Sequence, residues 1–433
     1  MRRRTFIGSG PLGIAGTVIA AGTSSAAVLK GSSVTEPEKI IPVIDNAEVI
    51  VLGGGPAGTA AAIAAARLGA NVLLIERYGY LGGMATGGLV IMIGERDERI
   101  KGLPLEFVER ILASDGRMVE TGRTVQHEPF FNPETFKYTC LDMCRTAGVR
   151  LLFHAWAVSI IVNKDKIEAV IVESKSGRQA IGCSMVVDCT GDADTAAWAD
   201  IPFENSTESY GLALDFIYGD VDYDRYRHFM TYSKDDWDVV MGRASKENIP
   251  WKPWYIGLHD QAWFNTHFKG NPADVLDLTA CEIDLRTRIM KHLDFFRKNV
   301  PGFERATLLQ TASQPCGRVS RRIIGEHVLT MEELESGVMS DRIGKVSGLK
   351  RGFVSDVPYG SLVPKKIENL LIAGRSISAT LDALNCIRGI TGCWVFGQAA
   401  GTAAVLSLTG NTTPRKLDVA SLQMSLRHQG VEI

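Results

Sequence analysis

Three glycines with an acidic residue beyond them form the most informative pattern in this 433-residue chain. In the stretch EVIVLGGGPAGTAAAIAAARLGANVLLIER, which begins at Glu48, Gly53, Gly55 and Gly58 follow the spacing G-x-G-x-x-G, and Glu76 lies near its end. Such a turn lets backbone N–H groups approach a pyrophosphate closely, and the acid can accept hydrogen bonds from ribose hydroxyls. The pattern therefore predicts dinucleotide binding.

The elements around these residues are the ones that such a site needs. Residues 49–52 are an apolar run typical of a buried strand, residues 59–68 are rich in alanine and predict a helix, and residues 72–75 predict a second strand. Pro56 suits the first helical turn, where no internal hydrogen bond is lost. The helix N-terminus then offers N–H donors and about half a positive charge to the phosphates. We expect a complete βαβ unit.

Three later stretches narrow the choice between NAD and FAD. Residues 78–88, YGYLGGMATGG, hold so many glycines that we expect their backbone to lie against a ligand. Residues 185–192, MVVDCTGD, read as a strand and a sharp turn. Residues 369–375, NLLIAGR, read as a strand that ends in Gly-Arg, and a glycine- and alanine-rich helix is expected over 392–408.

Together these stretches resemble the FAD-dependent oxidoreductase family of the glutathione-reductase-like flavoprotein superfamily, and most closely its heterodisulfide-reductase A-like branch. The resemblance covers about residues 47–433. It implies an α/β fold with a Rossmann-like FAD-binding domain built on a parallel sheet, a small β-meander insertion, and a mixed α+β substrate or cap domain. It also implies that the last helix points its N-terminus, near residues 391–393, at the pyrimidine edge of the flavin.

The resemblance assigns FAD contacts to residues in each of these stretches. The residues implied are Gly53, Gly55, Pro56, Ala57, Gly58, Glu76, Arg77, Gly82, Gly83, Met84, Ala85, Gly191, Asp192, Gly374, Arg375, Gly392 and Gln398.

The chain also departs from its relatives. It lacks a second glycine fingerprint, which argues against a dedicated NAD(P)H site, and it lacks a C-x₄-C pair, which argues against disulfide reductase chemistry. The spacing of its eight cysteines suits neither a metal site nor an iron–sulfur cluster. Relatives often carry histidine where Leu381 stands, so any chemistry done by that histidine must be done otherwise here.

The middle of the chain predicts the insertion and the cap. Residues 151–160 and 167–172 look like strands joined by a turn at 164–166, and residues 276–300 predict a helix closed by Pro301-Gly302. We expect the FAD-binding domain over 47–200 and 356–410, the cap over 201–355, and a C-terminal tail helix within 411–433.

Arginines are the candidate substrate-positioning residues. Arg318, Arg321 and Arg322 match an arginine-rich stretch of the family, in which Val319-Ser320 here replace Glu-Thr. We predict that Arg318, Arg322 and Arg388 bind a carboxylate or orient a hydroxylated substrate. The structural alternative is that Arg321 or Arg322 pairs with an acid such as Glu326.

Aromatic and histidine residues in the cap could flank such a substrate, because aromatic planes beside polar groups suit a sugar or another polyhydroxylated ring. Each tryptophan alone fits a core position better, and each histidine fits a surface or core position better than that of a base. The residues are Trp251, Trp254, Trp263, His259 and His267.

The N-terminus carries the features of an export signal. Residues 2–4 are arginines, and the order Arg-Arg-Thr-Phe-Ile over 3–7 resembles the twin-arginine pattern. An uncharged run rich in small residues ends near 25–27, as signal peptidase requires. We expect a twin-arginine signal peptide over 1–29 and a linker over 30–46, with an uncleaved anchor as the alternative. Export of folded protein would explain how a cofactor loaded in the cytoplasm reaches the periplasm.

These features predict an exported FAD-dependent oxidoreductase that moves hydride from a small polyhydroxylated or anionic substrate to flavin N5, with a base in the cap taking the proton. One alternative is a flavin electron-transfer subunit of a larger redox complex, and another is a flavin binder without catalysis. Expected partners are the substrate, the export machinery and a redox partner protein, with no stable membrane span after processing. The net charge of -2 argues against nucleic acid.

Overall fold

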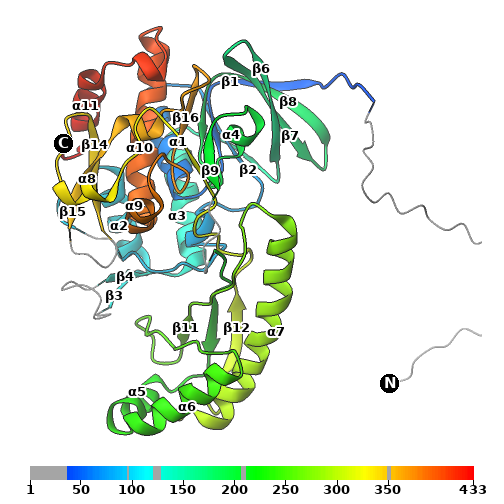
Figure 1. Ribbon diagram of the computed structural model, residues 1–433, viewed down its shortest axis with the longest axis vertical. Helices are drawn as coiled ribbons and strands as arrows, with labels where there is room; N and C mark the ends of the chain where they lie inside the picture. Colours follow the sequence, from blue (N-terminus) through cyan, green and yellow to red (C-terminus); the bar gives the residue numbers. More distant parts are fainter. Residues whose placement is uncertain (1–36, 95–96, 120–127, 206–210, 349–352) are drawn as a thin grey trace, which may run out of the picture. The chain divides into compact units, whose positions relative to one another are not determined.

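The centre of the fold is a seven-stranded sheet, in the upper part of Figure 1. In the order β5-β2-β1-β8-β7-β6 its strands are Arg150–Phe153, Val72–Glu76, Val43–Leu52, Gly177–Asp188, Lys166–Ser174 and Trp156–Asn163. Strand β16, Leu370–Ile372, pairs with the second half of β8. Strands β5, β2, β1, β8 and β16 run parallel, whereas β6, β7 and β8 form an antiparallel meander. The predicted Rossmann-like fold with a meander insertion is therefore confirmed.

This computed structural model describes residues 37–94, 97–119, 128–205, 211–348 and 353–433. Residues 41–433 form one compact unit, and residues 37–40 belong to a separate N-terminal unit, where they form no helix or strand. The predicted signal peptide over 1–29 lies outside the described residues.

Alternate residues of β1 face two different cores, which explains its unbroken apolar run. Val49 and Val51 pack into the cluster that contains helix α1, Pro56–Arg67, and helix α10, Ile390–Thr409. Ile50 and Leu52 pack on the other face with residues of the meander. Helices α2, Leu103–Ser114, and α3, Pro133–Thr146, extend the first layer beside α1 and α10.

The cap is a three-stranded antiparallel sheet with helices beside it, at the lower part of Figure 1. In the order β11-β10-β12 the strands are Ala262–Phe264, Phe216–Gly219 and Thr307–Thr311. The helices are α5, Tyr223–Tyr232, α6, Lys234–Lys246, and α7, Val275–Asn299. Asp274 begins α7 by accepting hydrogen bonds from the N–H groups of Leu276 and Asp277, and the helix ends before Pro301-Gly302, as predicted.

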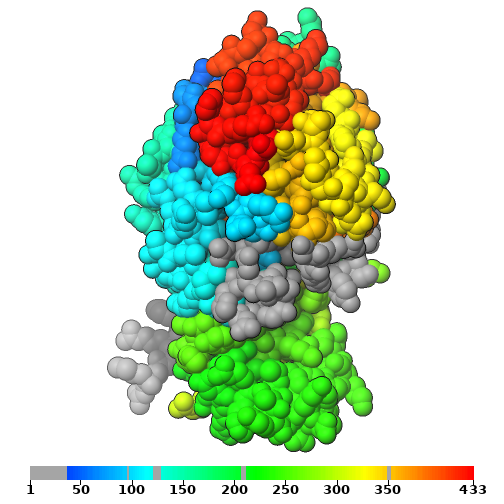
Figure 2. Space-filling model, turned by 90° about the vertical axis from the view of Figure 1, so that its left-hand side faces the viewer, coloured from blue at the N-terminus to red at the C-terminus, as the bar shows by residue number. Residues whose placement is uncertain are grey.

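Smaller elements connect the part built on the seven-stranded sheet with the cap, or complete the C-terminal part. Three strand pairs belong to them: β3 (Arg117–Val119) with β4 (Glu128–Phe130), β9 (Phe203–Asn205) with β13 (Arg321–Ile323), and β14 (Arg342–Ser347) with β15 (Val354–Pro358). The helices are α4 (Asp194–Trp198), α8 (Met331–Ser336), α9 (Leu381–Ile387) and α11 (Val419–His428). Short 3₁₀ turns lie at Gly83–Ala85, Tyr359–Leu362 and Pro414–Lys416. In Figure 2 the cap, in green, lies at the end opposite the C-terminal residues, in red.

The structure changes three of the expected boundaries. Strand β1 begins inside the expected linker over 30–46, because Val43 already pairs with Ala180 of β8. The expected strand over 151–160 is two strands, β5 and β6, separated at His154, whose φ is 56°. Strand β14 packs against α10 and α11, so residues 342–347 of the expected cap lie against the C-terminal helices. The expected tail helix within 411–433 is α11.

Among the described helices, none alone is long and apolar enough to cross a membrane. Helices α9 and α10 together pass a test of length and composition, although they meet at an angle of 99°. Most of α10 is buried between the elements that surround it.

Candidate active site

A cavity of about 1230 Å³ opens where the C-terminal ends of the parallel strands meet the cap. Ligand pockets usually hold about 300–1,000 Å³, so this one has room for a large ligand or for two. Its lining combines residues from the glycine turn after β1, the ends of β2, β8 and β16, the start of α10, and the cap. This is the position at which ligands bind in open parallel sheets.

The glycine turn faces the cavity through Gly53, Gly55, Pro56 and Ala57. Gly53 adopts a φ of +91°, and a Cβ atom there would lie 2.7 Å from the carbonyl oxygen of Cys189. Gly58 does not belong to the described cavity lining. Instead, its Cα lies so close to the turn that a Cβ would meet the Gly53 oxygen at 1.8 Å, so this glycine lets α1 pack on β1.

Gly55 gives a direct test of whether this turn was built for a ligand. Its φ of -71° and ψ of -174° suit any residue, and the only atom within 4 Å of a Cβ placed there is the Gly83 Cα at 3.9 Å. Neither the backbone nor the packing of the described residues requires glycine at this position. A pyrophosphate held by the N–H groups at the start of α1 would require it, so the turn fits a dinucleotide such as FAD.

Glu76 lies at the end of β2 and lines the same side of the cavity. Its Oε2 accepts a hydrogen bond from the Gly54 N–H at 2.7 Å, and its Oε1 accepts one from the Tyr78 N–H at 2.9 Å. Burial raises the pKa of this carboxyl, and the two N–H donors lower it. The neighbouring Arg77 also lines the cavity and lies over the ring of Trp156, 5.7 Å from its centre.

The glycine-rich loop after β2 lies beside the glycine turn. The Gly82 N–H donates to the Gly54 oxygen at 2.8 Å, which fixes the loop against the glycine turn. Gly83, Met84 and Ala85 line the cavity, whereas Gly82 is not among its described lining residues. Gly82 therefore holds the loop in place, and the next three residues face the cavity.

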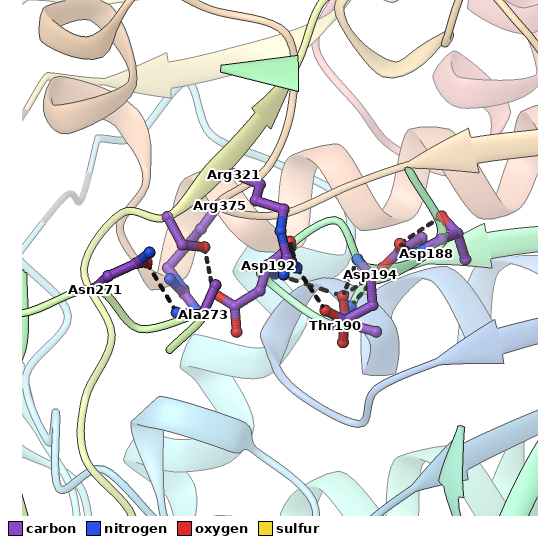
Figure 3. A network of polar contacts seen from close by, with 10 residues as sticks. Asp188, Thr190, Asp192, Asp194, Asn271, Ala273, Arg321 and Arg375 are labelled. Carbon is purple, nitrogen blue, oxygen red and sulfur yellow. Dashed lines mark hydrogen bonds and ion pairs between the residues drawn. The ribbon is translucent and has the colours of Figure 1, made fainter. Parts of the chain in front are cut away.

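Figure 3 shows how a buried carboxylate shapes the turn after β8. The two Asp188 oxygens accept hydrogen bonds from the backbone and hydroxyl groups of Thr190 and Thr195, at 2.6–2.9 Å. The turn places Gly191 and Asp194 on the cavity wall. Burial raises the pKa of Asp194 to about 6, although Arg321 forms an ion pair with it at 3.0 Å.

Asp192, the predicted FAD contact in this turn, is not among the described lining residues. It accepts a hydrogen bond from the Ser320 hydroxyl and lies 3.6 Å from Nη2 of Arg375 (Figure 3). Gly374 and Arg375 themselves line the cavity at the end of β16. Nη1 of Arg375 is buried and has no hydrogen-bond partner among the described residues, so it fits an anionic ligand.

The start of α10 faces the cavity. The residues that do so begin at Gly389, slightly before the predicted residues 391–393. Gly389, Ile390 and Cys393 line the cavity, and the helix begins at Ile390. Gly392 and Gln398 are not among the described lining residues. Gln398 lies two turns into the helix, where its Oε1 accepts from the Leu103 N–H at 2.9 Å and its amide donates to Gln429 at 3.1 Å. These contacts give Gln398 a structural role.

The candidate arginines separate into two groups. Arg318 and Arg388 line the cavity. Arg322 does not: its side chain is buried, donates to the Ala379 carbonyl at 2.7 Å and pairs with Glu204, so the expectation that it positions a substrate is corrected. Spacing alone could not distinguish them, because β13 begins at Arg321 and turns Arg322 inward. The alternative, that Arg321 or Arg322 pairs with an acid, is confirmed with other partners than Glu326. Arg321 pairs with Asp194, and Arg322 pairs with Glu204.

The cap contributes an aromatic wall. Trp251, Trp254, Trp263 and His267 line the cavity. His259 is exposed and lies 2.9 Å from Asp224 outside the described lining. Leu381 begins α9 outside the described lining too, and its neighbour Asp382 lines the cavity.

Sequence reasoning missed two residues beside this wall. Asn265 lines the cavity, and Asp215 lies directly behind it with no exposed surface. The alternation Trp263, Asn265, His267 was a readable signal, because residues two apart in a strand face the same side. Nothing in the sequence pointed to Asp215.

All eight cysteines are unpaired, and seven of them are buried. Burial raises the pKa of Cys140 and Cys144, so both thiols stay protonated. Across the described ranges, no group of three or more histidine, cysteine or acidic side chains is placed to hold a metal ion.

Comparisons with known proteins agree with this geometry. The model of the family described as FAD dependent oxidoreductase matches residues 48–349 and 348–426, and a model of the C-terminal domain of alanine dehydrogenase matches only residues 17–78. A curated relative, digeranylgeranylglycerophospholipid reductase 2 of Methanothermobacter thermautotrophicus, is 29% identical over 150 residues, which are 33% of this chain and 39% of the relative. The match thus spans well under half of that protein.

Two solved structures share the fold at low sequence identity. A geranylgeranyl bacteriochlorophyll reductase-like protein from Thermoplasma acidophilum has a TM-score of 0.50 at 14% identity, over 90% of this chain and 84% of the other. The p-nitrophenol 4-monooxygenase of Pseudomonas putida has a TM-score of 0.50 at 12% identity, over 86% and 83%. The particular heterodisulfide-reductase A-like branch finds no support in these matches.

Proposed function

The chain belongs to the family of FAD-dependent oxidoreductases, and on this premise we propose that it oxidises a small organic substrate by hydride transfer to FAD bound in the cavity. One observation carries the proposal: a single cavity is lined on one side by the dinucleotide-binding turn and on the other by the cap face. A cofactor and a substrate would therefore meet inside it.

The residues that would hold FAD are those whose geometry already fits a dinucleotide. They are Gly53 and Gly55 in the turn, Glu76 at the end of β2, Arg375 with its unpaired N–H group, and the start of α10. When bound, FAD supplies a two-electron acceptor beside the cap. The positive end of α10 favours the negative charge that the bound cofactor gains on reduction.

The cap residues would bind the substrate and manage its proton. Arg318 offers a fixed positive charge, and Trp254 and Trp263 offer apolar planes on the same wall. We assign His267 as the base that takes the substrate proton, since it is the histidine that lines this wall in the described part of the chain.

The test is to purify the protein, record its visible spectrum, and add organic acids, sugars and amines anaerobically while following the flavin absorption. A flavin spectrum that bleaches with a small molecule supports the proposal. A flavoprotein that only a redox partner protein bleaches would instead identify an electron-transfer subunit, and a colourless protein that refuses added FAD would exclude both.

We also propose that the N-terminal arginines direct export through the twin-arginine route into the periplasm. The sequence order over residues 3–7 supports this proposal. Replacing both Arg3 and Arg4 by lysine should leave the flavoprotein in the cytoplasmic fraction, measured by immunoblot of fractionated bacteria. Unchanged export of the variant would contradict it.

A further inference from the structure

The cap wall is built from alternate residues of one extended segment. Trp263, Asn265 and His267 line the cavity, while the residues between them, Phe264 and Thr266, are fully buried in the cap. The segment continues from β11, so its alternation follows from the pleat of a strand. Whatever holds Asn265 in place therefore controls what this wall presents to a substrate.

Asp215 fixes the orientation of the Asn265 amide. This carboxylate lies just before β10 and is fully buried. It accepts from the Thr266 N–H at 2.9 Å and from Nδ2 of Asn265 at 2.9 and 3.1 Å. Both Asp215 oxygens accept from Nδ2, so the NH₂ group of Asn265 faces Asp215. The amide oxygen of Asn265 must then face the opposite way.

That oxygen holds Arg318. Nη2 of Arg318 donates to Oδ1 of Asn265 at 2.9 Å and to the Thr266 carbonyl at 3.4 Å. The backbone of Arg318 is held as well, since its N–H donates to the Gly211 carbonyl at 2.9 Å. The Nε and Nη1 groups have no protein acceptor among the described residues, and the side chain lines the cavity. A permanently charged, immobilised donor thus faces the substrate space.

The surroundings of Arg318 favour an anion on a flat, apolar body. Trp254 and Trp263 pair through reciprocal backbone hydrogen bonds, and their rings lie 6.1 Å apart on the same wall. The indole N–H of Trp263 is buried and has no hydrogen-bond partner among the described residues. Apart from His267, the base proposed above, the wall offers the Arg318 donors, whereas both polar atoms of Asn265 are already occupied. A polyhydroxylated substrate would also need acceptors for its own hydroxyl protons.

We infer that this wall binds the carboxylate of a flat, apolar organic acid, with Arg318 as the binding residue and Asp215, acting through Asn265, as a positioning residue. The inference rests on the proposed function, because it names the substrate class of the same cavity. Of the two substrate classes that the sequence allows, polyhydroxylated and anionic, the inference favours the anionic one.

The first experiment compares 2-naphthoate with the uncharged 2-naphthamide, using flavin absorption of the holoprotein and tryptophan fluorescence as two readouts. We expect naphthoate to bind at least tenfold more tightly than the amide. Equal affinities in a protein that binds flavin would overturn the inference and leave the proposed function intact. Fluorescence also reports naphthoate binding in protein without flavin, so the two failures are distinguishable.

The second experiment uses variants. Arg318→Gln should weaken naphthoate binding by about 10- to 100-fold and leave naphthamide unchanged, Arg318→Lys should weaken it less, and the exposed cap variant Arg227→Gln should change neither. If Arg318→Gln and Arg318→Lys both bind naphthoate as tightly as the wild type, the inference fails.

A double exchange tests the positioning role. In Asp215→Asn with Asn265→Asp, the new amide can still accept from the Thr266 N–H and donate to residue 265, so size and hydrogen bonding are conserved. The carboxylate, however, then pairs with Arg318. We expect normal flavin content with at least tenfold weaker naphthoate binding. If the double variant binds naphthoate as tightly as the wild type, Asp215 has only a structural role.

Discussion

Gly55 is a glycine that the protein's own backbone and packing do not require, which makes it a sharp probe of the ligand. We predict that Gly55→Ala weakens FAD binding by at least tenfold, because the methyl group projects into the cavity where the pyrophosphate would approach. The free energy of unfolding of the flavin-free protein should change by less than about 1 kcal/mol. Titration of flavin-free protein with FAD measures the affinity, and urea denaturation measures the free energy of unfolding. Gly242→Ala on α6 is the control, since a Cβ there meets no atom within 4 Å; equal FAD affinity in both variants would contradict the prediction.

His267 and His259 form a matched pair for testing the base. Both lie in the cap, but only His267 lines the cavity, while His259 is exposed beside Asp224. We predict that His267→Gln slows flavin reduction by the substrate about 10²- to 10⁴-fold and that His259→Gln leaves it unchanged. Anaerobic stopped-flow measurement of flavin absorption checks both. A full rate in His267→Gln would remove this residue from the mechanism.

Asp215 should make the stability of the protein depend on pH. Burial raises its pKa to about 7 from an ordinary 3.8, although Thr266, Asn265 and Arg318 oppose the rise. Between these two values the folded protein binds more protons than the unfolded chain, so this contribution to stability is present below about pH 4 and is lost as pH rises through 7. Relative to the wild type, Asp215→Asn should therefore gain roughly 2–3 kcal/mol between pH 5 and pH 8. Urea denaturation at both pH values measures the difference, and no change with pH would refute the ionisation assigned here.

At the scale of elements, the contact between α1 and α10 joins the two ends of the FAD-binding part. A Cβ at Gly397 would lie 2.0 Å from the Ala57 oxygen, and one at Gly401 would lie 2.1 Å from the Ala61 oxygen. These glycines let the two helix backbones touch, and no side chain can move aside to make room. The contact holds the start of α10 against the turn that begins α1.

We predict that Gly401→Ala destabilises the protein by at least 1–3 kcal/mol through overpacking. Its flavin content should fall with stability, because the shift of α10 also moves Gly389 and Ile390 at the cavity. Thermal denaturation and the ratio of flavin to protein absorbance measure the two effects. A melting temperature equal to that of the wild type would show that α10 can move away at little cost.

Elements formed by local pattern could be predicted, and tertiary placement could not. Apolar spacing and capping residues predict three of these elements from sequence: the strand over 49–52, the alanine-rich helix, and the helix that begins near 276. Arg318 and Arg322 have the same residue type and nearly the same position, and only the path of β13 separates cavity from core. Asp215 became visible only because its partners come from residues 265 and 266, distant in the chain.

At the scale of the whole molecule, the cavity is lined by segments that are far apart in sequence. Residues of the glycine turn, the turn after β8, the end of β16 and the start of α10 share one wall. A ligand that spans this wall should stabilise all four segments together by mass action.

We predict that adding FAD to flavin-free protein slows amide hydrogen exchange jointly in 53–58, 189–191, 374–375 and 389–393. The tip of the β6–β7 hairpin, near Lys164, lies outside the described lining and should exchange at an unchanged rate. Exchange followed by mass spectrometry of peptides measures this. Protection of 53–58 alone would mean that the ligand contacts only the first turn.

The pairing of α1 with α10 also sets a schedule for biosynthesis. The glycine turn is translated near residue 53, but the helix that buttresses it leaves the ribosome only after residue 409 has been made. For most of translation the nascent chain thus contains the glycine turn and α1, but not α10, so the apolar side of α1 that packs on α10 stays exposed. Coenzyme capture by the complete site must therefore wait until α10 has been made.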